Sequence, residues 1–283
     1  MTVSNVENAN QVGNLASADT DSRKRASKAN RWSSAKTRLA QLIVVAMILL
    51  CWEFSSGRIL DDVLVSKPSD VFPELWSWVV TGDLIYHAVS TFQNAMFGLF
   101  AGVAAGLIVG VILGESKRLS NTFEPFITAL YTMPKHALIP LFIMWVGIGA
   151  ELRILTAASI VFFVVFYNTF FGIRDVSEDL QNSVKTMGGS FFDVLFRVNL
   201  PSALIWVVAA MKMAVPQGIV GVVVAEMLAG DRGLGYLVAL NAGTFNSAGT
   251  FAAIFVLLVF GYVIDRIVTI STRRALAWKL DEQ

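Results

Sequence analysis

Few residues of this 283-residue chain have side chains that carry out covalent chemistry, and those few are scattered. Two histidines, His87 and His136, and one cysteine, Cys51, stand at no spacing that would place them with other ligands around a metal ion. The chain also lacks the Gly-x4-Gly-Lys-Ser/Thr loop that cradles phosphates, so any ATP has to be bound by another chain. We therefore predict no catalytic residues, no metal site and no cofactor in this chain.

One lysine stands deep inside an apolar stretch. Lys212 follows Pro201 by eleven residues, which is about 17 Å along a helix and close to the middle of a bilayer. Exposing a lysine to lipid at that depth costs about 2.5–3.5 kcal/mol. Its side chain is therefore expected either to line a water-filled path or to pair with a carbonyl or carboxylate at a helix contact.

Prolines and a glutamate mark further positions in the apolar stretches. Lys135 stands between Pro134 and Pro140, and a helix loses backbone hydrogen bonds at each proline. Broken helices at membrane depth border protein or a water-filled cavity, which makes Lys135 a candidate for a path through the membrane, and Pro216 a candidate by the same argument. Glu226, a further candidate for the path, lies near the outer end of its stretch, where it would contact a partner protein, form an outer gate or be a solvated end residue.

The elements that must position these residues are long and apolar. Hydrophobic residues make up 55% of the chain and charged residues 15%, and the mean hydropathy is +0.63, whereas a soluble chain carries about 25% charged residues. This composition predicts an all-α polytopic membrane protein in contact with lipid, and the net charge of +1 argues against a nucleic-acid partner. Six segments are long enough to cross about 30 Å of hydrocarbon: roughly 38–56, 88–114, 122–147, 152–172, 201–228 and 250–270.

Lysine and arginine residues orient these segments, because cytoplasmic loops retain them. With the amino terminus inside, 16 of the 22 lie on the inner side and only Arg58, Lys67, Arg153 and Arg232 on the outer side. We therefore predict that both termini are cytoplasmic. The predicted organisation is a disordered tail at 1–37, a first transmembrane helix at 38–56, a periplasmic segment with an interfacial helix at 57–87, a core of five transmembrane helices at 88–275 and a tail at 276–283.

The second segment carries glycines at a strict spacing of four residues: Gly98, Gly102, Gly106, Gly110 and Gly114. Glycine on one face of a helix lets another helix approach closely, and lipid offers no hydrophobic force that would substitute for such packing. This face is expected to pack against a helix of the same subunit, with a seam between two subunits as the alternative.

The one long inner loop, residues 174–200, has a pattern of its own. Its apolar residues recur at steps of three and four: Val184, Met187, Phe191, Leu195 and Val198. Gly188-Gly189 interrupts this pattern, and Ser190 stands three residues before Asp193, which is the spacing of a capping box. The loop therefore predicts a helix, a turn at the two glycines and a second helix on the cytoplasmic face.

This loop also carries the most specific motif of the chain: Gly188, nine residues, then Val198-Asn199-Leu200-Pro201. It resembles the ATPase-docking loop of inner-membrane permease subunits of binding-protein-dependent ABC importers, in which Glu-Ala-Ala, three residues, Gly, nine residues and Ile-x-Leu-Pro are usual. Here Asn182-Ser183-Val184 stands in place of Glu-Ala-Ala, and Val198 in place of Ile. Further segments resemble the nitrate, sulfonate and taurine branch of these permeases: Lys67-Pro68-Ser69, Met133-Pro134-Lys135, residues 140–147, Val224-Ala225-Glu226-Met227-Leu228 and Gly233-Leu234-Gly235.

The resemblance implies a type I ABC importer fold in the bacterial inner membrane. It also implies a second permease copy as a homodimer, two cytoplasmic ATPase subunits that bind ATP and Mg²⁺, and a periplasmic substrate-binding protein. The implied function is the import of a small solute such as a sulfonate, taurine, nitrate or a similar organic anion, with no covalent chemistry by this chain. The alternative function is a secondary transporter or channel without an ATPase partner, which needs ion-coupling carboxylates within its spans.

The resemblance assigns ATPase coupling to twelve residues of the loop: Asn182, Ser183, Val184, Thr186, Met187, Gly188, Gly189, Ser190, Phe191, Phe192, Leu200 and Pro201. An apolar helix face here would enter a groove of the ATPase. Leu200-Pro201 would join the loop rigidly to the fifth span, because proline is tolerated in the first turn of a helix and fixes φ. The alternative for the loop is an amphipathic helix that rests on lipid.

Overall fold

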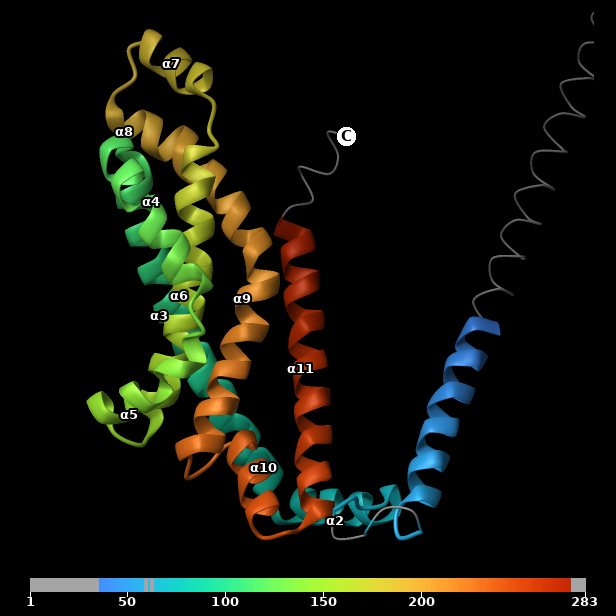
Figure 1. Cartoon of the computed structure of the whole chain (residues 1–283). Coiled ribbons are helices and arrows are strands. Elements are labelled where there is room, and N and C mark those ends of the chain that lie inside the picture. The colour runs from blue at the N-terminus through green and yellow to red at the C-terminus, as the bar shows by residue number, and fades with distance from the viewer. Residues whose placement is uncertain (1–35, 59–60, 62–63, 276–283) are drawn as a thin grey trace, which may run out of the picture. The chain divides into compact units, whose positions relative to one another are not determined.

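The computed structural model describes residues 36–58, 61 and 64–275 of the chain (Figure 1). These residues form helices joined by loops, which confirms the all-α prediction. The predicted tail at 276–283 lies outside the described residues, as does the predicted tail at 1–37 apart from its last two residues.

Residues up to Asp61 form a unit of their own, whose described part contains the helix Lys36–Ser55. This helix of 20 residues is long and apolar enough to cross a membrane, and its side chains from Lys36 to Cys51 are exposed. Apolar side chains that face outward all around a helix suit a lipid environment. The helix corresponds to the predicted first transmembrane segment, 38–56.

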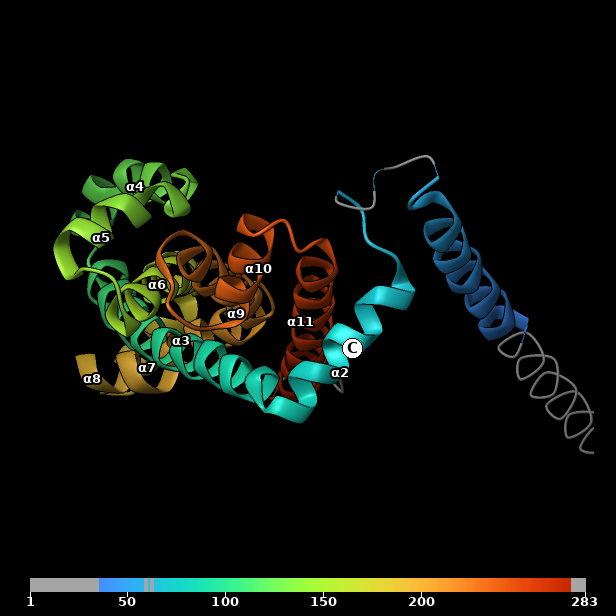
Figure 2. The ribbon, with the colours of Figure 1, turned by 90° about the horizontal axis from the view of Figure 1, so that it is seen from below.

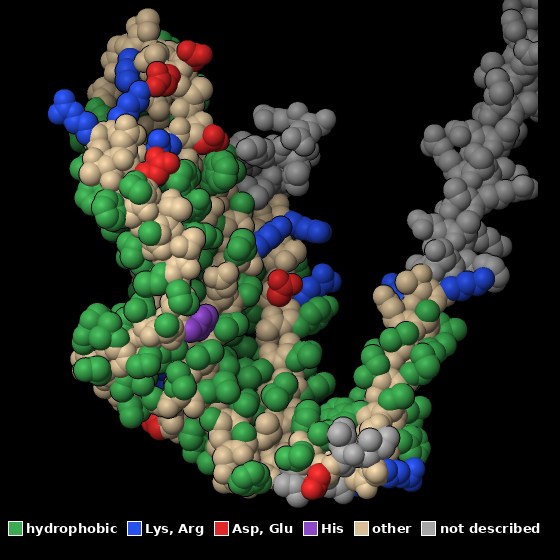
Figure 3. All heavy atoms as spheres, viewed as in Figure 1, with side chains coloured by type: hydrophobic (Ala, Val, Ile, Leu, Met, Phe, Trp, Pro, Cys, Tyr) green, Lys and Arg blue, Asp and Glu red, His purple; other side chains and the backbone are tan. Residues whose placement is uncertain are grey.

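The core of the second unit is a stack of long helices, α3 (Asp83–Glu115), α6 (Ala150–Arg174) and α9 (Leu200–Ala229), in which α6 packs against both of the others. Figures 1 and 2 show this arrangement, with α11 (Ser247–Ala275) beside α9. Buried aliphatic side chains of α6 and α9 form one cluster of this core: Val161, Val164, Val165, Val207, Ala210 and Ala214. The face of the second unit that Figure 3 shows is largely apolar along these helices. On α3, Phe97, Phe100 and Ile108 are exposed, as expected of a surface that faces lipid.

The predicted third span is bent rather than straight. Helix α4 (Lys117–Thr132) and the pair η1 (Lys135–Leu138) and α5 (Ile139–Val146) meet at an angle of 85°. The break falls at Met133-Pro134, as the proline predicts, but the second predicted break is wrong. Pro140 lies in the first turn of α5, where its missing N–H would have had no partner in any case.

The structure differs from the predicted elements at three further places. Helix α9 runs without a break from Leu200 to Ala229 with Pro216 inside it, so the predicted interruption at Pro216 is wrong. Helix α3 begins at Asp83 rather than at residue 88. A short helix that was not predicted, α10 (Leu234–Gly243), connects α9 to α11.

Helix α2 (Pro68–Thr81) occupies the position of the predicted interfacial helix. Val71 and Trp78 are buried against the rest of the unit, whereas Trp76 and Val80 are exposed. The helix packs on α11 and α3 and crosses their ends in Figures 1 and 2. Its placement at a membrane interface stays a prediction, supported by these exposed apolar side chains.

Candidate functional site

The loop between α6 and α9 folds as helix, turn and helix, which confirms the prediction for residues 174–200. Helix α7 (Glu178–Thr186) is capped by Ser177, whose hydroxyl accepts a hydrogen bond from the Leu180 N–H, and it ends before Gly188. Gly188 has a φ of +85°, a conformation that costs an L-residue about 1–2 kcal/mol. Ser190 and Asp193 form the predicted capping box at the start of α8 (Phe191–Val194).

The tip of this loop is apolar and exposed. Met187 is 88% exposed, and the aromatic residues Phe191, Phe192 and Phe196 are each at least 60% exposed. The rings lie beside one another, with centroids 5.7 Å apart for Phe191 and Phe192. In Figure 1 the loop forms one extreme end of the second unit, beyond the long helices. Large apolar side chains gathered at a protruding end are typical of a surface that binds a partner.

The other predicted loop residues precede this tip, on α7 and in the turn. Asn182, Ser183 and Thr186 are exposed on α7. The hydroxyls of Ser183 and Thr186 donate within the helix, to the Asp179 carbonyl and to the Asn182 carbonyl respectively. Gly189 packs directly on Val184, because a Cβ at Gly189 would lie only 2.6 Å from the Val184 Cγ1. The turn therefore needs glycine at both positions, one for its φ and one for this contact.

The loop joins α9 without an interruption of helical backbone. Helix α8 continues into the π-helical turn η2 (Leu195–Asn199), and α9 follows at Leu200. The Leu200 N–H bonds to the Leu195 carbonyl, five residues back, and Pro201 stands in the first turn of α9. Pro201 has no N–H to donate the next α-helical hydrogen bond, and the wider π-helical turn just before it accommodates this missing bond. The aromatic tip and the fifth span thus share one continuous helical segment.

Polar bonds tie the ends of the loop to neighbouring spans. Lys117 at the start of α4 bonds to Glu178 at 2.5 Å, and Asn199 Nδ2 donates to Glu115 Oε1 of α3 at 2.8 Å. Arg174 pairs with Glu124. The Lys117 ammonium holds the pKa of Glu178 below its usual range, because it bonds to the carboxylate form and attracts its charge.

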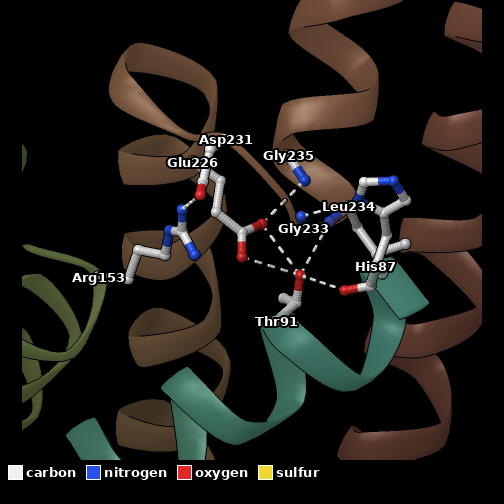
Figure 4. A network of polar contacts seen from close by, with 8 residues as sticks. All are labelled: His87, Thr91, Arg153, Glu226, Asp231, Gly233, Leu234 and Gly235. Carbon is white, nitrogen blue, oxygen red and sulfur yellow. Dashed lines mark hydrogen bonds and ion pairs between the residues drawn. The ribbon is translucent and has the colours of Figure 1, made fainter. Parts of the chain in front are cut away.

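At the opposite end of α9, Glu226 is 1% exposed and belongs to a network of polar contacts (Figure 4). Its carboxylate accepts hydrogen bonds from Thr91 Oγ1 at 3.0 Å and from the Gly235 N–H at 2.9 Å. Thr91 Oγ1 in turn accepts from the Leu234 N–H at 2.9 Å. The alternative that Glu226 is a solvated end residue is therefore wrong, since burial and three elements, α3, α9 and α10, enclose it.

Two further residues extend this network. The Gly233 N–H donates to His87 Nδ1 at 2.9 Å, so the hydrogen of a neutral His87 ring is on Nε2. Arg153 of α6 is 1% exposed and pairs with Asp231 in the loop after α9. Figure 4 shows Arg153 and Thr91 on opposite sides of Glu226. Together the network fixes the turn between α9 and α10 to α3 and α6.

The predicted path residues do not come together. Lys135 is half-buried, and its ammonium donates a hydrogen bond to the Tyr131 carbonyl. The Lys135 Nζ lies 5.0 Å from the centroid of the Tyr131 ring. It thus caps the end of α4 at the break. Lys212 is exposed and makes no hydrogen bond or ion pair with the described residues, which leaves pairing within the subunit unsupported. Lys212 and Glu226, fourteen residues apart on one helix, are separated by about 21 Å along its axis.

The predicted glycine face lies against α6. All five glycines of α3, Gly98 to Gly114, are buried. A Cβ at Gly102 would lie 2.6 Å from the Ala158 carbonyl, and one at Gly106 would lie 2.9 Å from the Phe162 carbonyl. The seam that this spacing builds is therefore within the subunit, and a side chain on it would separate two helices of the core.

The network around Glu226 is called the outer network after the predicted orientation. Sequence analysis missed several of its residues: His87, Thr91, Arg153 and Asp231. A signal existed for Arg153, which stands three residues after the start of α6 and is followed by a long, largely apolar stretch of that helix. Such a charge is costly unless it has a partner. The partner itself, Asp231, lies 78 residues further along the chain, and no local pattern connects the two.

The fold can be compared with solved structures. A chain of the MetNI methionine ABC transporter, in its inward-facing conformations, superposes with a TM-score of 0.55 at 19% identity, over 70% of this chain and 96% of that chain. A chain from an amino acid ABC transporter crystallised with histidines has a TM-score of 0.56 at 15% identity, over 71% and 97%. The fold is thus that of type I ABC importer permeases.

Curated relatives cover most of the chain. A permease named for aliphatic sulfonates transport in Bacillus subtilis strain 168 is 29% identical over 84% of this chain and 87% of its own length. A taurine transport system permease protein of Escherichia coli K12 is 25% identical over 88% and 92%. A formylaminopyrimidine transport permease protein of Halalkalibacterium halodurans is 26% identical over 76% and 86%.

Residues 102–276, more than half of the chain, match the family described as the binding-protein-dependent transport system inner membrane component, and the chain belongs to this family. It is a multi-pass membrane protein and a permease subunit of an ABC transporter rather than an enzyme. The resemblance inferred from the loop motif is thereby confirmed.

Proposed function

We propose that two copies of this chain form the channel of an ATP-driven importer for a small organic anion, with taurine and aliphatic sulfonates as the first candidates. A binding protein delivers the solute at the outer face, and two ATPase subunits, which hold ATP and Mg²⁺, bind the loop between α6 and α9. Both termini lie on the side of this loop, in the cytoplasm of a bacterium. The names of the relatives support the substrate class, and the distribution of lysine and arginine supports the orientation.

The single observation that carries the coupling role is the exposed apolar tip on a continuous helix. Met187, Phe191 and Phe192 are exposed at the tip of the loop, and α8, η2 and α9 form one helical segment. An ATPase that holds this tip in a groove moves the start of α9 with it, because no flexible joint intervenes. A helix that merely rests on lipid has no use for a rigid connection of this kind.

In this mechanism the chain alternates the side to which its path opens, and it performs no covalent step. Closure of the ATPase subunits on ATP pulls the two loops together, and α9 transmits the movement into the bilayer. Lys212 on α9 is exposed along the same helix and is the candidate that meets an anion in the path. Exposing a cation to lipid at that depth costs free energy, so the Lys212 ammonium is expected to face a water-filled space.

The test of the coupling role is affinity purification of tagged variants in mild detergent, with the co-purified ATPase quantified by mass spectrometry. Phe191→Asp should lower ATPase recovery about tenfold or more, because a carboxylate cannot be buried in an apolar groove at low cost. Phe245→Asp is the matched control. Phe245 is an aromatic residue of similar exposure, at 74%, in the loop between α10 and α11 at the other end of the unit. Equal ATPase recovery in both variants would refute the coupling role.

The substrate proposal needs a separate measurement. Uptake of radiolabelled taurine by cells that contain the complete transporter should depend on ATP and should be inhibited by alkanesulfonates. Lys212→Met should reduce uptake while ATPase recovery stays at the wild-type level. Taurine uptake that is unchanged when the chain is deleted would remove taurine from the list of substrates without affecting the coupling role.

A further inference from the structure

Two charged side chains of α9 and α11, Lys212 and Asp265, belong neither to the coupling loop nor to the outer network. Helix α9 begins, and α11 ends, on the side of the second unit that carries the coupling loop (Figure 1). Lys212 lies about 18 Å from the start of α9, and Asp265 about 15 Å from the end of α11. Both charges are therefore well inside candidate membrane spans, where exposure of a charge to lipid costs free energy.

The two charges lie near each other on one side of the contact between α9 and α11. Val215 of α9 and Ile264 of α11 line the same apolar groove and belong to the same buried cluster. Lys212 precedes Val215 by three residues and Asp265 follows Ile264 directly, so the two charges lie within about one helical turn of the same level. Neither Lys212 nor Asp265 lines this groove, and both are exposed.

The helical rotation shows which side they share. At about 100° per residue, Lys212 lies about 60° to one side of Val215, and Asp265 lies about 100° to one side of Ile264. Because α9 and α11 run in opposite directions, these two rotations lead to the same side of the helix pair, away from the groove. A small molecule on that side would meet one charge of each sign.

Both charges lack a partner within the described part of the chain. No hydrogen bond or ion pair joins Lys212 or Asp265 to another described residue. The neighbouring cation, Arg266, lies over the Tyr262 ring of its own helix, with its guanidinium carbon 5.9 Å from the ring centroid. Ionisable side chains inside spans face a water-filled space and mark the path of a solute. An unpaired lysine and an unpaired aspartate on one side therefore indicate a ligand with two opposite charges.

Pro216 adds a hydrogen-bond acceptor at the same place. Its nitrogen carries no hydrogen, so it cannot donate to the carbonyl four residues earlier, which is that of Lys212. Helix α9 nevertheless continues through Pro216. The residue Lys212 thus offers a cationic donor on its side chain and, on its backbone, a carbonyl that lacks the usual helical bond from residue 216.

We propose that Lys212 and Asp265 bind the transported solute by two opposite charges, and that this solute is a zwitterion, an aminosulfonate or an amino acid. The Lys212 ammonium bonds to its anionic group, and the Asp265 carboxylate and the Lys212 carbonyl accept hydrogen bonds from its ammonium. The inference rests on the proposed function, in which the exposed side of α9 lines the path. It narrows the substrate class, because a simple alkanesulfonate or nitrate would leave Asp265 without a partner.

The test is calorimetric titration of the full-length chain, purified together with its ATPase and without the binding protein, in lipid nanodiscs. Three probes are compared: taurine carries both charges, 2-hydroxyethanesulfonate lacks the ammonium, and ethanolamine lacks the anionic group. Taurine is expected to bind, and each of the other two about tenfold more weakly, because each leaves one charge of the site without a partner. Absence of taurine binding at millimolar concentration, or equal binding of all three probes, would overturn the proposal.

Two variants separate the two contacts. Asp265→Asn should weaken taurine binding about tenfold and leave the affinity for 2-hydroxyethanesulfonate at or above the wild-type value, because only taurine has an ammonium. Lys212→Met should weaken the binding of both sulfonates. Arg266→Gln is the matched control: it removes the exposed charge next to Asp265, which lies over Tyr262, and should leave all affinities unchanged. An equal loss of affinity for both sulfonates in Asp265→Asn would show that Asp265 does not contact the ammonium, and would refute the site.

Failure of this site and failure of the proposed function give different results. If the coupling role and the dependence of taurine uptake on this chain hold while the three probes bind equally, only the zwitterion site is removed. If Phe191→Asp and Phe245→Asp recover the ATPase equally while Asp265→Asn weakens taurine selectively, the coupling role fails and the site stands.

Discussion

The tip of the coupling loop and the opposite end of α9 are held in place by interactions of very different range. At the coupling loop, Ser190 and Asp193 cap a helix across three residues, and the turn at Gly188 is closed by bonds within five residues. At the other end, the bond from Thr91 to Glu226 spans 135 residues and the bond from Gly233 to His87 spans 146. The tip of the loop is therefore a local structure that is left exposed, and only the base of the loop is tied to distant residues, from Asn199 to Glu115 and from Glu178 to Lys117. The outer network, in contrast, buries its polar groups and connects distant helices.

This difference indicates different roles for the two ends. A local, self-supporting loop keeps its shape while the spans move, so it suits a surface that transmits force from a partner. The outer network restrains α3, α6 and the turn before α10 together, so any opening at that end has to break buried hydrogen bonds. Breaking buried polar contacts costs more than moving an exposed loop. We expect the outer end to resist deformation more strongly than the inner end.

The largest effect is expected where α3 and α6 join the two ends. Gly106→Leu should remove most of the assembled protein from the membrane, at a cost of about 3 kcal/mol or more, because its side chain would overlap the Phe162 carbonyl and separate the helices. Ala105→Leu is the control, since Ala105 is exposed on another face of α3. The measurement is the yield of monodisperse protein on size exclusion in detergent. Normal yield for Gly106→Leu would contradict the close seam.

A smaller effect is expected from the outer network alone. Thr91→Val keeps the shape of the side chain but removes the hydroxyl that bonds to Glu226 and to the Leu234 N–H. The free energy of unfolding should fall by about 1–3 kcal/mol, because two buried groups lose a partner. Thermal unfolding in detergent measures the change.

The control for this prediction is Thr272→Val. Thr272 is buried to a similar degree, but its hydroxyl bonds only to carbonyls of its own helix, those of Val268 and Thr269. Those carbonyls keep their helical bonds when the hydroxyl is lost. An equal loss of stability in the two variants would show that Thr91 contributes no more than a bond within one helix, and that the network does not hold the outer end.

At the inner end a comparable local change should act on coupling rather than on global stability. Gly188→Ala forces an L-residue into a φ of +85°, at a cost of about 1–2 kcal/mol. Because the loop is local, we expect lower ATPase recovery with an unchanged unfolding temperature. Gly243→Ala is the control, since Gly243 has an ordinary φ and an added Cβ meets no atom within 4 Å. A lowered unfolding temperature in Gly188→Ala alone would show that the loop is part of the global fold.

The same difference in range explains what the sequence could reveal. The capping box, the turn at Gly188 and the two short helices follow from residues three to nine apart, so local patterns predicted them. The residues around Glu226 come from α3, α6 and α10, and their meeting depends on how the helices pack. Sequence reasoning therefore found Glu226 as a charge in an apolar stretch but not the donors that surround it.

The prolines show a second limit of sequence reasoning. Pro134, Pro140 and Pro216 all remove a backbone donor, yet only the first coincides with a break between helices. Pro140 stands in a first turn, where no bond is lost, and at Pro216 the helix continues past one missing bond. At the break the Lys135 ammonium bonds to a freed carbonyl of α4. The presence of a proline in an apolar stretch therefore does not by itself decide whether the helix breaks there.

The smallest expected effect concerns the ion pair between Lys117 and Glu178, whose side chains are 84% and 72% exposed. Exposed pairs contribute little and are screened by salt, so Lys117→Gln should leave ATPase recovery and the unfolding temperature at physiological salt nearly unchanged. The pair does lower the pKa of Glu178 in the folded state. Its contribution is therefore present above the ordinary carboxyl pKa of 4.5 and is lost as the pH falls through the lowered value.

This pH dependence distinguishes the ion pair from a packing contact, whose contribution to stability does not change with pH. In low salt, the wild type should lose slightly more stability than Lys117→Gln when the pH is lowered from neutral to below the carboxyl pKa, and the difference should disappear in high salt. The measurement is the unfolding temperature of both proteins at two pH values and two salt concentrations. A large effect of Lys117→Gln at every condition would mean that the inner loop depends on a long-range bond as much as the outer end does, and the contrast between the two ends of α9 would no longer hold.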